Sequence, residues 1–231
     1  MAVPAIVNFK HKFVFIHIPK TAGRSVCRAL MSINGSYMFD VTEVEKQNFI
    51  VGSANWLKTR LANLTLRDRL KLGLYNITYN KFDLSEFDFI FVIRHPLERA
   101  VSSFNYCLST INFKGKKLHA GKALPDAISF QEFICLDEKY NYEYYNHFSV
   151  SQVDYSSLDP LYNSVLIPFD KLEERLNCYF NKRIGLDLKL SKVNASKSNS
   201  FNVSQVNGFC RDYIASRFSK DFVLYSSVTE N

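Results

Sequence analysis

The fold is decided by residues 13–25, which read Phe-Val-Phe-Ile-His-Ile-Pro-Lys-Thr-Ala-Gly-Arg-Ser. The run over 12–18 is short, aromatic and β-branched, and Pro19 ends it, which is typical of a buried strand. From Ser25, apolar residues recur at helical spacing as far as about 34–35. The stretch therefore predicts a buried strand, a short loop and a helix.

A second junction of the same kind begins at residues 87–93, which read Phe-Asp-Phe-Ile-Phe-Val-Ile and predict another buried strand. Arg94 and His95 follow, and then Pro96, which suits the first position of a helix because its missing N–H is not needed there. Apolar residues at helical spacing continue as far as 111. A second strand, loop and helix are predicted.

Later segments repeat this alternation. We predict a third strand over 165–169, a helix over 171–181 and a last helix over about 206–220. Alternating strands and helices favour an α/β fold with a central parallel sheet flanked by crossover helices. The 231 residues suit one domain, which we place at 1–231.

The composition narrows the class of protein. Hydrophobic residues make up 47% of the chain, as in a globular protein, and the net charge of +7 favours an anionic partner. We find no apolar run long enough to span a bilayer and no signal peptide, so we expect a cytoplasmic protein. The five Cys are spread along the chain without the spacing of metal ligands, so we expect no metal site.

The first loop has the features of an anion site. The start of a helix presents backbone N–H groups and a favourable dipole to an anion. Lys20 adds a positive charge, and the small residues at 22 and 23 allow an oxyanion to approach the backbone. We predict that the contacts come from Lys20, Thr21, Ala22, Gly23, Arg24 and Ser25. The order of residues is not that of a Walker loop, because the Lys precedes the Gly.

The second junction also suits an anion. Arg94 offers a bidentate fork to a phosphate, and Ser102 follows eight residues later on the polar face of the next helix. We expect these two side chains to converge on one phosphate. Arg99 lies between them, and we expect it to make a structural contact instead.

The two motifs together resemble the PAPS-dependent sulfotransferases, most closely the carbohydrate sulfotransferase branch (PAPS is 3′-phosphoadenosine 5′-phosphosulfate). The resemblance is sharp at 13–26 and 90–104 and weaker over later segments. It implies a three-layer, P-loop-like fold, with the first loop on the 5′-phosphosulfate and with Arg94 and Ser102 on the 3′-phosphate. It also implies sulfuryl transfer to a hydroxyl group without a metal ion, with Lys20 stabilising the leaving phosphate. Arg24 departs from the family pattern, which has a small hydroxyl residue at this position.

The general base is the least certain part of the site. Related enzymes often carry a His before the second motif, where this chain has Asn76, which cannot accept the proton. His147 lies in a segment that resembles the acceptor side of the family, and we take it as the candidate base. His17 and His119 are alternatives, as is a Glu such as Glu43 or Glu45.

Three functions stay open from the sequence. The first is a sulfotransferase acting on a carbohydrate, neutral or anionic, or on another hydroxyl-bearing acceptor. The second is a P-loop kinase of small molecules, which would require the Walker order and an acid for Mg²⁺. The third is a non-catalytic nucleotide- or RNA-binding module, which basic charge with many aromatic residues permits. The resemblance favours the first, so we do not expect a nucleic acid as the partner.

Overall fold

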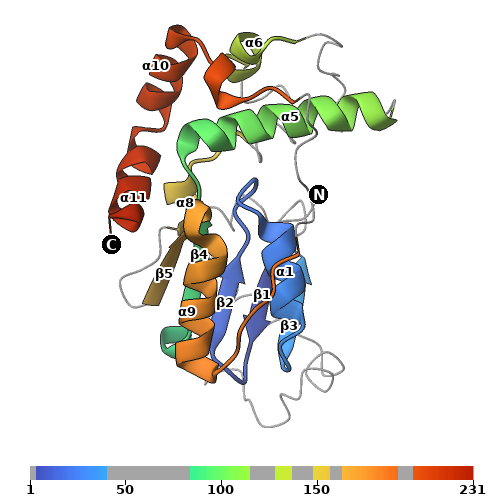
Figure 1. The fold of residues 1–231 in the computed structure, drawn as a ribbon, viewed down its shortest axis with the longest axis vertical. Coiled ribbons are helices and arrows are strands. Elements are labelled where there is room, and N and C mark those ends of the chain that lie inside the picture. The colour runs from blue at the N-terminus through green and yellow to red at the C-terminus, as the bar shows by residue number, and fades with distance from the viewer. Residues whose placement is uncertain are drawn as a thin grey trace.

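A five-stranded mixed sheet with the order β3-β1-β2-β4-β5 forms the centre of the molecule (Figure 1). The computed structural model describes residues 4–40, 84–114, 128–136, 148–156, 163–191 and 200–230. The strands are β1 (Pro4–Asn8), β2 (Phe13–Ile16), β3 (Ser36–Asp40), β4 (Asp88–Ile93) and β5 (Asn163–Pro168). The predicted α/β class is therefore confirmed.

The parallel core of the sheet was predicted, but its antiparallel side was not. β2 pairs with β4 and β4 with β5 in parallel, whereas β1 pairs antiparallel with both β2 and β3. The sheet is therefore mixed: its core is the predicted parallel sheet, and β1 and β3 add an antiparallel side that was not predicted. A tight turn joins β1 to β2, and the Asn8 side chain holds it by accepting from the His11 backbone N–H at 2.8 Å.

The helices agree with the predicted pattern, with two shifts. They are α1 (Gly23–Met31), α5 (Pro96–Lys114), α6 (Phe130–Ile134), α8 (Gln152–Ser156), α9 (Leu172–Ile184), α10 (Gly208–Arg217) and α11 (Ser219–Thr229). α1 begins two residues earlier than predicted. The single last helix is in fact two helices, because the backbone leaves the helical conformation at Phe218 (φ −112°, ψ 31°).

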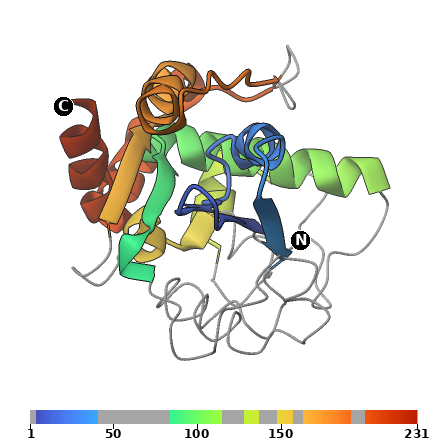
Figure 2. The same cartoon turned by 90° about the horizontal axis from the view of Figure 1, so that it is seen from below.

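Helices cover both faces of the sheet (Figures 1 and 2). α1 and α9 cover one face, where Val26, Leu30 and Phe180 pack on strand residues such as Phe13. The other face packs against α8 and α11, with Tyr155 fully buried in that cluster. A third apolar cluster joins α5, α6 and α10 beyond the sheet. The layers place the ends of β2 and β4 beneath α5.

The helices of the described ranges include none with the length and apolar character needed to cross a membrane. The expectation of a single domain over 1–231 stays a prediction.

Candidate active site

The loop after β2 has an unusual backbone. Lys20 and Ala22 adopt positive φ angles of 71° and 60°, a conformation that residues with a side chain seldom adopt. Ala22 is the N-cap of α1; among the described residues no side chain caps this helix, and its first turn contains no acidic residue. The helix start is therefore left to be satisfied by water or an anion.

Two buried contacts hold this loop from inside the protein. Thr21 is fully buried, and its hydroxyl donates to the carbonyl oxygen of Ile18 at 2.8 Å. Arg99 of α5, which is also buried, donates from Nε to the carbonyl oxygen of Pro19 at 3.2 Å. The Thr21 hydroxyl therefore braces the loop from inside the protein, and a role of Thr21 towards a ligand stays a prediction.

Lys20 points from the loop towards α5. Its Nζ lies 4.3 Å from the ring centroid of Tyr106. The pKa of Lys20 is lowered to about 8, chiefly by burial and to a smaller extent by repulsion from Arg94 and Arg24, while Cys107 acts in the opposite direction. Positive charge in this site is only partly compensated, so an anionic ligand would be stabilised there.

Arg94 begins the second junction and reaches back to the first. Its Nη1 donates to the carbonyl oxygen of Lys20 at 3.2 Å, and its Nε donates to Glu98 at 3.3 Å. The guanidinium carbon lies 4.2 Å from the ring centroid of Phe169. Burial lowers the pKa of Arg94. The structure therefore brings together Lys20 and Arg94, which the sequence had placed in separate motifs.

The other predicted ligands Ser102, Arg24 and Ser25 lie on the two helices that follow the loops. Ser102 is half-buried on α5, one turn beyond Glu98, and the described hydrogen bonds do not join it to Arg94. Arg24 is exposed and Ser25 is half-buried, both in the first turn of α1. Their roles towards a nucleotide stay predictions.

The described residues do not include the candidate bases His147, His119, Glu43 and Glu45, and Asn76 also lies outside them. His17 is described, and its ring packs directly against Gly23 in the loop. His17 therefore supports the backbone of the anion site, and its role as a base stays an alternative.

Four residues of the site region were not assigned a role from sequence. Tyr106 and Phe169 place aromatic rings beside Lys20 and Arg94. Gln152 and Asp221 are fully buried and form hydrogen bonds close to Arg94. Phe169, Gln152 and Asp221 lie in segments that resemble later segments of the family's sequences. The resemblance did not show what these side chains contact.

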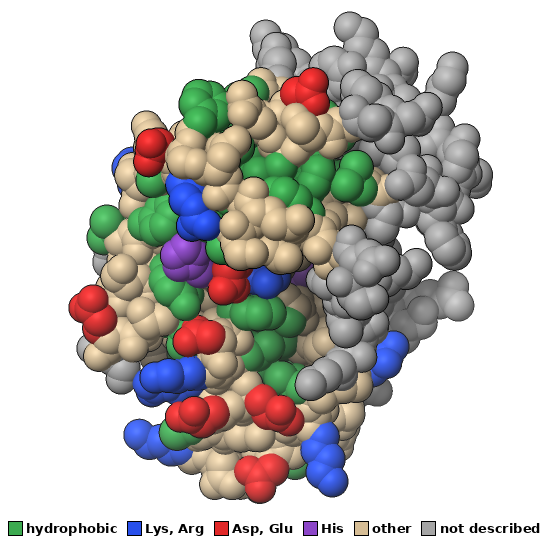
Figure 3. Space-filling model, turned by 45° about the horizontal axis from the view of Figure 1, so that its top comes forward, with side chains coloured by type: hydrophobic (Ala, Val, Ile, Leu, Met, Phe, Trp, Pro, Cys, Tyr) green, Lys and Arg blue, Asp and Glu red, His purple; other side chains and the backbone are tan. Residues whose placement is uncertain are grey.

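Charge on the surface is distributed differently from charge in this site. On the face in Figure 3, described Lys and Arg side chains are separated by Asp, Glu and apolar side chains, without one broad basic patch. The site at Lys20 and Arg94 is therefore a better candidate for binding an anion than the described surface on this face.

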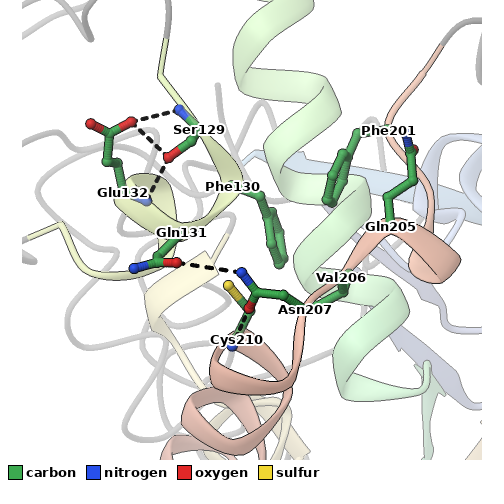
Figure 4. Close-up of a pocket in the computed structure, with 9 residues that line it drawn as sticks. All are labelled: Ser129, Phe130, Gln131, Glu132, Phe201, Gln205, Val206, Asn207 and Cys210. Atoms are coloured by element: carbon green, nitrogen blue, oxygen red, sulfur yellow. Dashed lines mark hydrogen bonds between the residues drawn. The ribbon is translucent and has the colours of Figure 1, made fainter.

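A separate pocket of about 520 Å³ lies between α6 and α10 (Figure 4). Its polar side chains largely bond to one another: Glu132 closes a capping box with Ser129, and Asn207 donates to Gln131 at 3.4 Å. Its one charged lining residue is Glu132, and its lining includes no Lys or Arg. The pocket therefore does not suit a phosphorylated nucleotide.

The Lys20–Arg94 site offers donors to two anionic groups. One anion would meet the uncapped start of α1 and Lys20, and a second would meet the Arg94 guanidinium. Glu98 is the carboxylate that the described contacts place beside these cations, and it is half-buried on the Arg94 side. Anionic groups on a ligand would compensate the charges of Arg94 and Arg24, which lower the pKa of Lys20.

The model of the sulfotransferase family matches residues 3–226, which is nearly the whole chain. No curated protein and no solved structure matches.

Proposed function

Because this chain belongs to the sulfotransferase family, a family of enzymes that use PAPS, we propose that it transfers the sulfuryl group of PAPS to a hydroxyl group of a carbohydrate. The observation that carries the proposal is the contact between the two motifs, in which Arg94 donates to the backbone of Lys20. Family membership also decides against the kinase and the RNA-binding module.

In this proposal each of the two anion sites binds a different part of PAPS, the sulfuryl donor. The loop amides, Lys20 and the start of α1 hold the 5′-phosphosulfate. Arg94 and Ser102 hold the 3′-phosphate, which distinguishes PAPS from ATP. The supporting evidence is that burial and neighbouring cations lower the pKa of Lys20, as expected for a site that awaits negative charge.

Transfer proceeds by in-line displacement at sulfur. The acceptor oxygen forms a bond to sulfur while the bond from sulfur to the 5′-phosphate oxygen breaks. That phosphate oxygen gains negative charge, and the Lys20 ammonium lies on the same loop to stabilise it. Removing one such donor typically raises the barrier by about 3 to 4 kcal/mol.

The acceptor hydroxyl must also lose its proton. We keep His147 as the proposed base because its segment resembles the acceptor side of the family. His17 is the described alternative, but its ring packs against Gly23 and supports the loop. The carbohydrate acceptor is proposed from the resemblance to the carbohydrate branch. The sequence also has Lys at 114, 116, 117 and 122, which would attract an anionic glycan, and 13 Tyr, whose rings can stack on sugars.

The first test is calorimetric titration with adenosine 3′,5′-bisphosphate, 5′-AMP and ATP with Mg²⁺. We expect tight binding only of the bisphosphate, and loss of this preference in Arg94→Ala. Arg28→Ala is the matched control, because Arg28 is exposed in the last turn of α1. Equal binding of bisphosphate and 5′-AMP by the unmodified chain, or tighter binding of ATP, would contradict the proposal.

The acceptor is tested separately with ³⁵S-labelled PAPS. Sulfated and unsulfated glycans are compared with a phenol and with a tyrosine peptide. Incorporation of label into a glycan is expected, with Lys20→Met abolishing it. Incorporation only into the phenol or the peptide would leave the enzyme class in place but reject the carbohydrate acceptor.

A further inference from the structure

The backbone of Arg94 lies where β4 has ended and α5 has not begun, so regular structure does not satisfy its N–H and C=O groups. The side chain of Gln152 satisfies both. Its Oε1 accepts from the Arg94 N–H at 2.9 Å, and its Nε2 donates to the Arg94 carbonyl oxygen at 2.8 Å. Because Gln152 is fully buried, these two bonds do not compete with water, and they fix the position from which the guanidinium extends.

Gln152 is itself held by the C-terminal helix. Asp221, in the first turn of α11, accepts from the backbone N–H of Gln152 at 2.9 Å and from that of Val153 at 3.0 Å. The hydroxyl of Ser151 donates to the same carboxylate. Asp221 is fully buried and thus caps the start of α8 from another part of the chain. The orientation of the Gln152 side chain therefore depends on α11.

The same carboxylate compensates the buried cation of Arg99. Burial lowers the pKa of Arg99, and attraction to Asp221 is the first effect that opposes it. The Arg99 guanidinium in turn donates to the carbonyl oxygen of Pro19 at the start of the anion loop. One buried residue of α11 therefore acts on both junctions, through Gln152 on Arg94 and through Arg99 on Pro19.

We propose that Gln152 and Asp221 are positioning residues that set the preference of this site for a nucleotide with a 3′-phosphate. Neither is proposed to touch the nucleotide. They hold the Arg94 backbone and the loop at a fixed separation, so that both anion sites fit one ligand. The inference rests on the proposed function, because it takes Arg94 as the residue that binds the 3′-phosphate.

The test uses the ratio of two dissociation constants, that of 5′-AMP divided by that of adenosine 3′,5′-bisphosphate. A variant that is partly unfolded weakens both constants by the same factor, so the ratio reports the geometry of the site alone. Gln152→Met has nearly the same volume and removes both bonds to Arg94. We expect the ratio to fall about tenfold or more, because a displaced guanidinium loses a charge-assisted hydrogen bond.

Asp221→Asn and Asp154→Asn form a matched pair. Asp221→Asn keeps the shape but removes the charge, and it places an N–H₂ group against backbone donors. Asp154 is exposed on α8, so its replacement is the control. We expect Asp221→Asn to lower the ratio and also to weaken 5′-AMP binding, because the Pro19 loop is released, whereas Asp154→Asn changes neither.

A ratio in Gln152→Met within twofold of that of the unmodified chain overturns the inference. If this variant does not fold, Gln152→Glu is measured instead, since it keeps the acceptor for the Arg94 N–H and loses only the donor. The same ratio is then read from the rise in melting temperature that each nucleotide causes. A failure of the proposed function is distinct, because the unmodified chain itself would then show no preference for the bisphosphate.

Discussion

The ring of His17 lies so close to Gly23 that a β-carbon at position 23 would fall 1.6 Å from its Cδ2 and 2.0 Å from its Nε2. Contacts of this length do not occur between non-bonded atoms, so only glycine fits beside this ring. The close approach joins the end of the β2 segment to the first residue of α1. It explains in steric terms why the loop needs a glycine before its helix.

Gly23→Ala is expected to displace either the His17 ring or the anion loop. We expect binding of adenosine 3′,5′-bisphosphate to weaken by about a hundredfold, because small misplacements of binding groups have effects of this size. Calorimetry measures the loss. Gly208→Ala is the control, since a β-carbon there meets nothing within 4 Å. The double variant His17→Ala/Gly23→Ala should recover part of the affinity, and no recovery would contradict the steric explanation.

The lowered pKa of Lys20 predicts how the stability of the unliganded protein depends on pH. Its pKa of about 8 lies below the ordinary value of 10.5, so the unfolded chain binds more protons than the folded one between these pH values. The stability of the unliganded protein should therefore rise with pH across that window. The cost of burying the charged lysine is fully present below about pH 8.

Phosphate groups next to Lys20 would return its pKa towards 10.5. At pH 8 this predicts uptake of about half a proton for each nucleotide bound, since the group is then half protonated in the free protein. Calorimetry in buffers of different ionisation enthalpy measures the uptake. Lys20→Met should show none, and an equal uptake in that variant would assign the proton to another group.

The parallel core and both anion loops could be predicted because their signals are local. Each strand is a short apolar run, and each loop stands directly before a helix. β1 and β3 were missed because their pairing is antiparallel and, for β3, distant in sequence. Such strands are defined by their partners more than by their own composition.

The site was predictable to the same extent. Lys20 and Arg94 each stand in a recognisable motif, so their roles could be proposed before their contact was known. Gln152 and Asp221 act through hydrogen bonds between segments far apart in the chain, which no local pattern contains. Likewise, the break at Phe218 that separates α10 from α11 was not predicted, because its residues are compatible with one continuous helix.

Phe169→Leu is expected to weaken binding at the Arg94 site selectively. The Phe169 ring lies beneath the guanidinium, with 4.2 Å between the ring centroid and the guanidinium carbon, and leucine lacks the aromatic face. We expect the dissociation constant of the bisphosphate to rise about three- to tenfold while that of 5′-AMP changes little. Phe209→Leu on the exposed side of α10 is the control. An equal effect on both nucleotides would show that Phe169 acts on the fold and not on Arg94.

Tyr179→Phe is expected to lower stability without changing nucleotide selectivity. The Tyr179 hydroxyl donates to Asp88 Oδ2 at 2.6 Å, and Asp88 also pairs with Arg183 and accepts from Asn163 at 2.9 Å. Burial, followed by the bond to Asp88, raises the pKa of Tyr179, so the hydroxyl stays protonated as a donor. Hydrogen bonds to charged groups contribute about 1.5 to 3 kcal/mol, and we expect a loss of this order in urea denaturation.

This cluster lies at the start of β4, whereas Arg94 follows its end. The ratio of the two nucleotide dissociation constants should therefore match that of the unmodified chain, in contrast to the Gln152 and Phe169 variants. Tyr37→Phe serves as the control for stability, because no described hydrogen bond involves that hydroxyl. A change in the ratio caused by Tyr179→Phe would mean that any loss of stability alters selectivity. Only substitutions of residues that contact the Arg94 junction are expected to change the ratio of dissociation constants independently of stability.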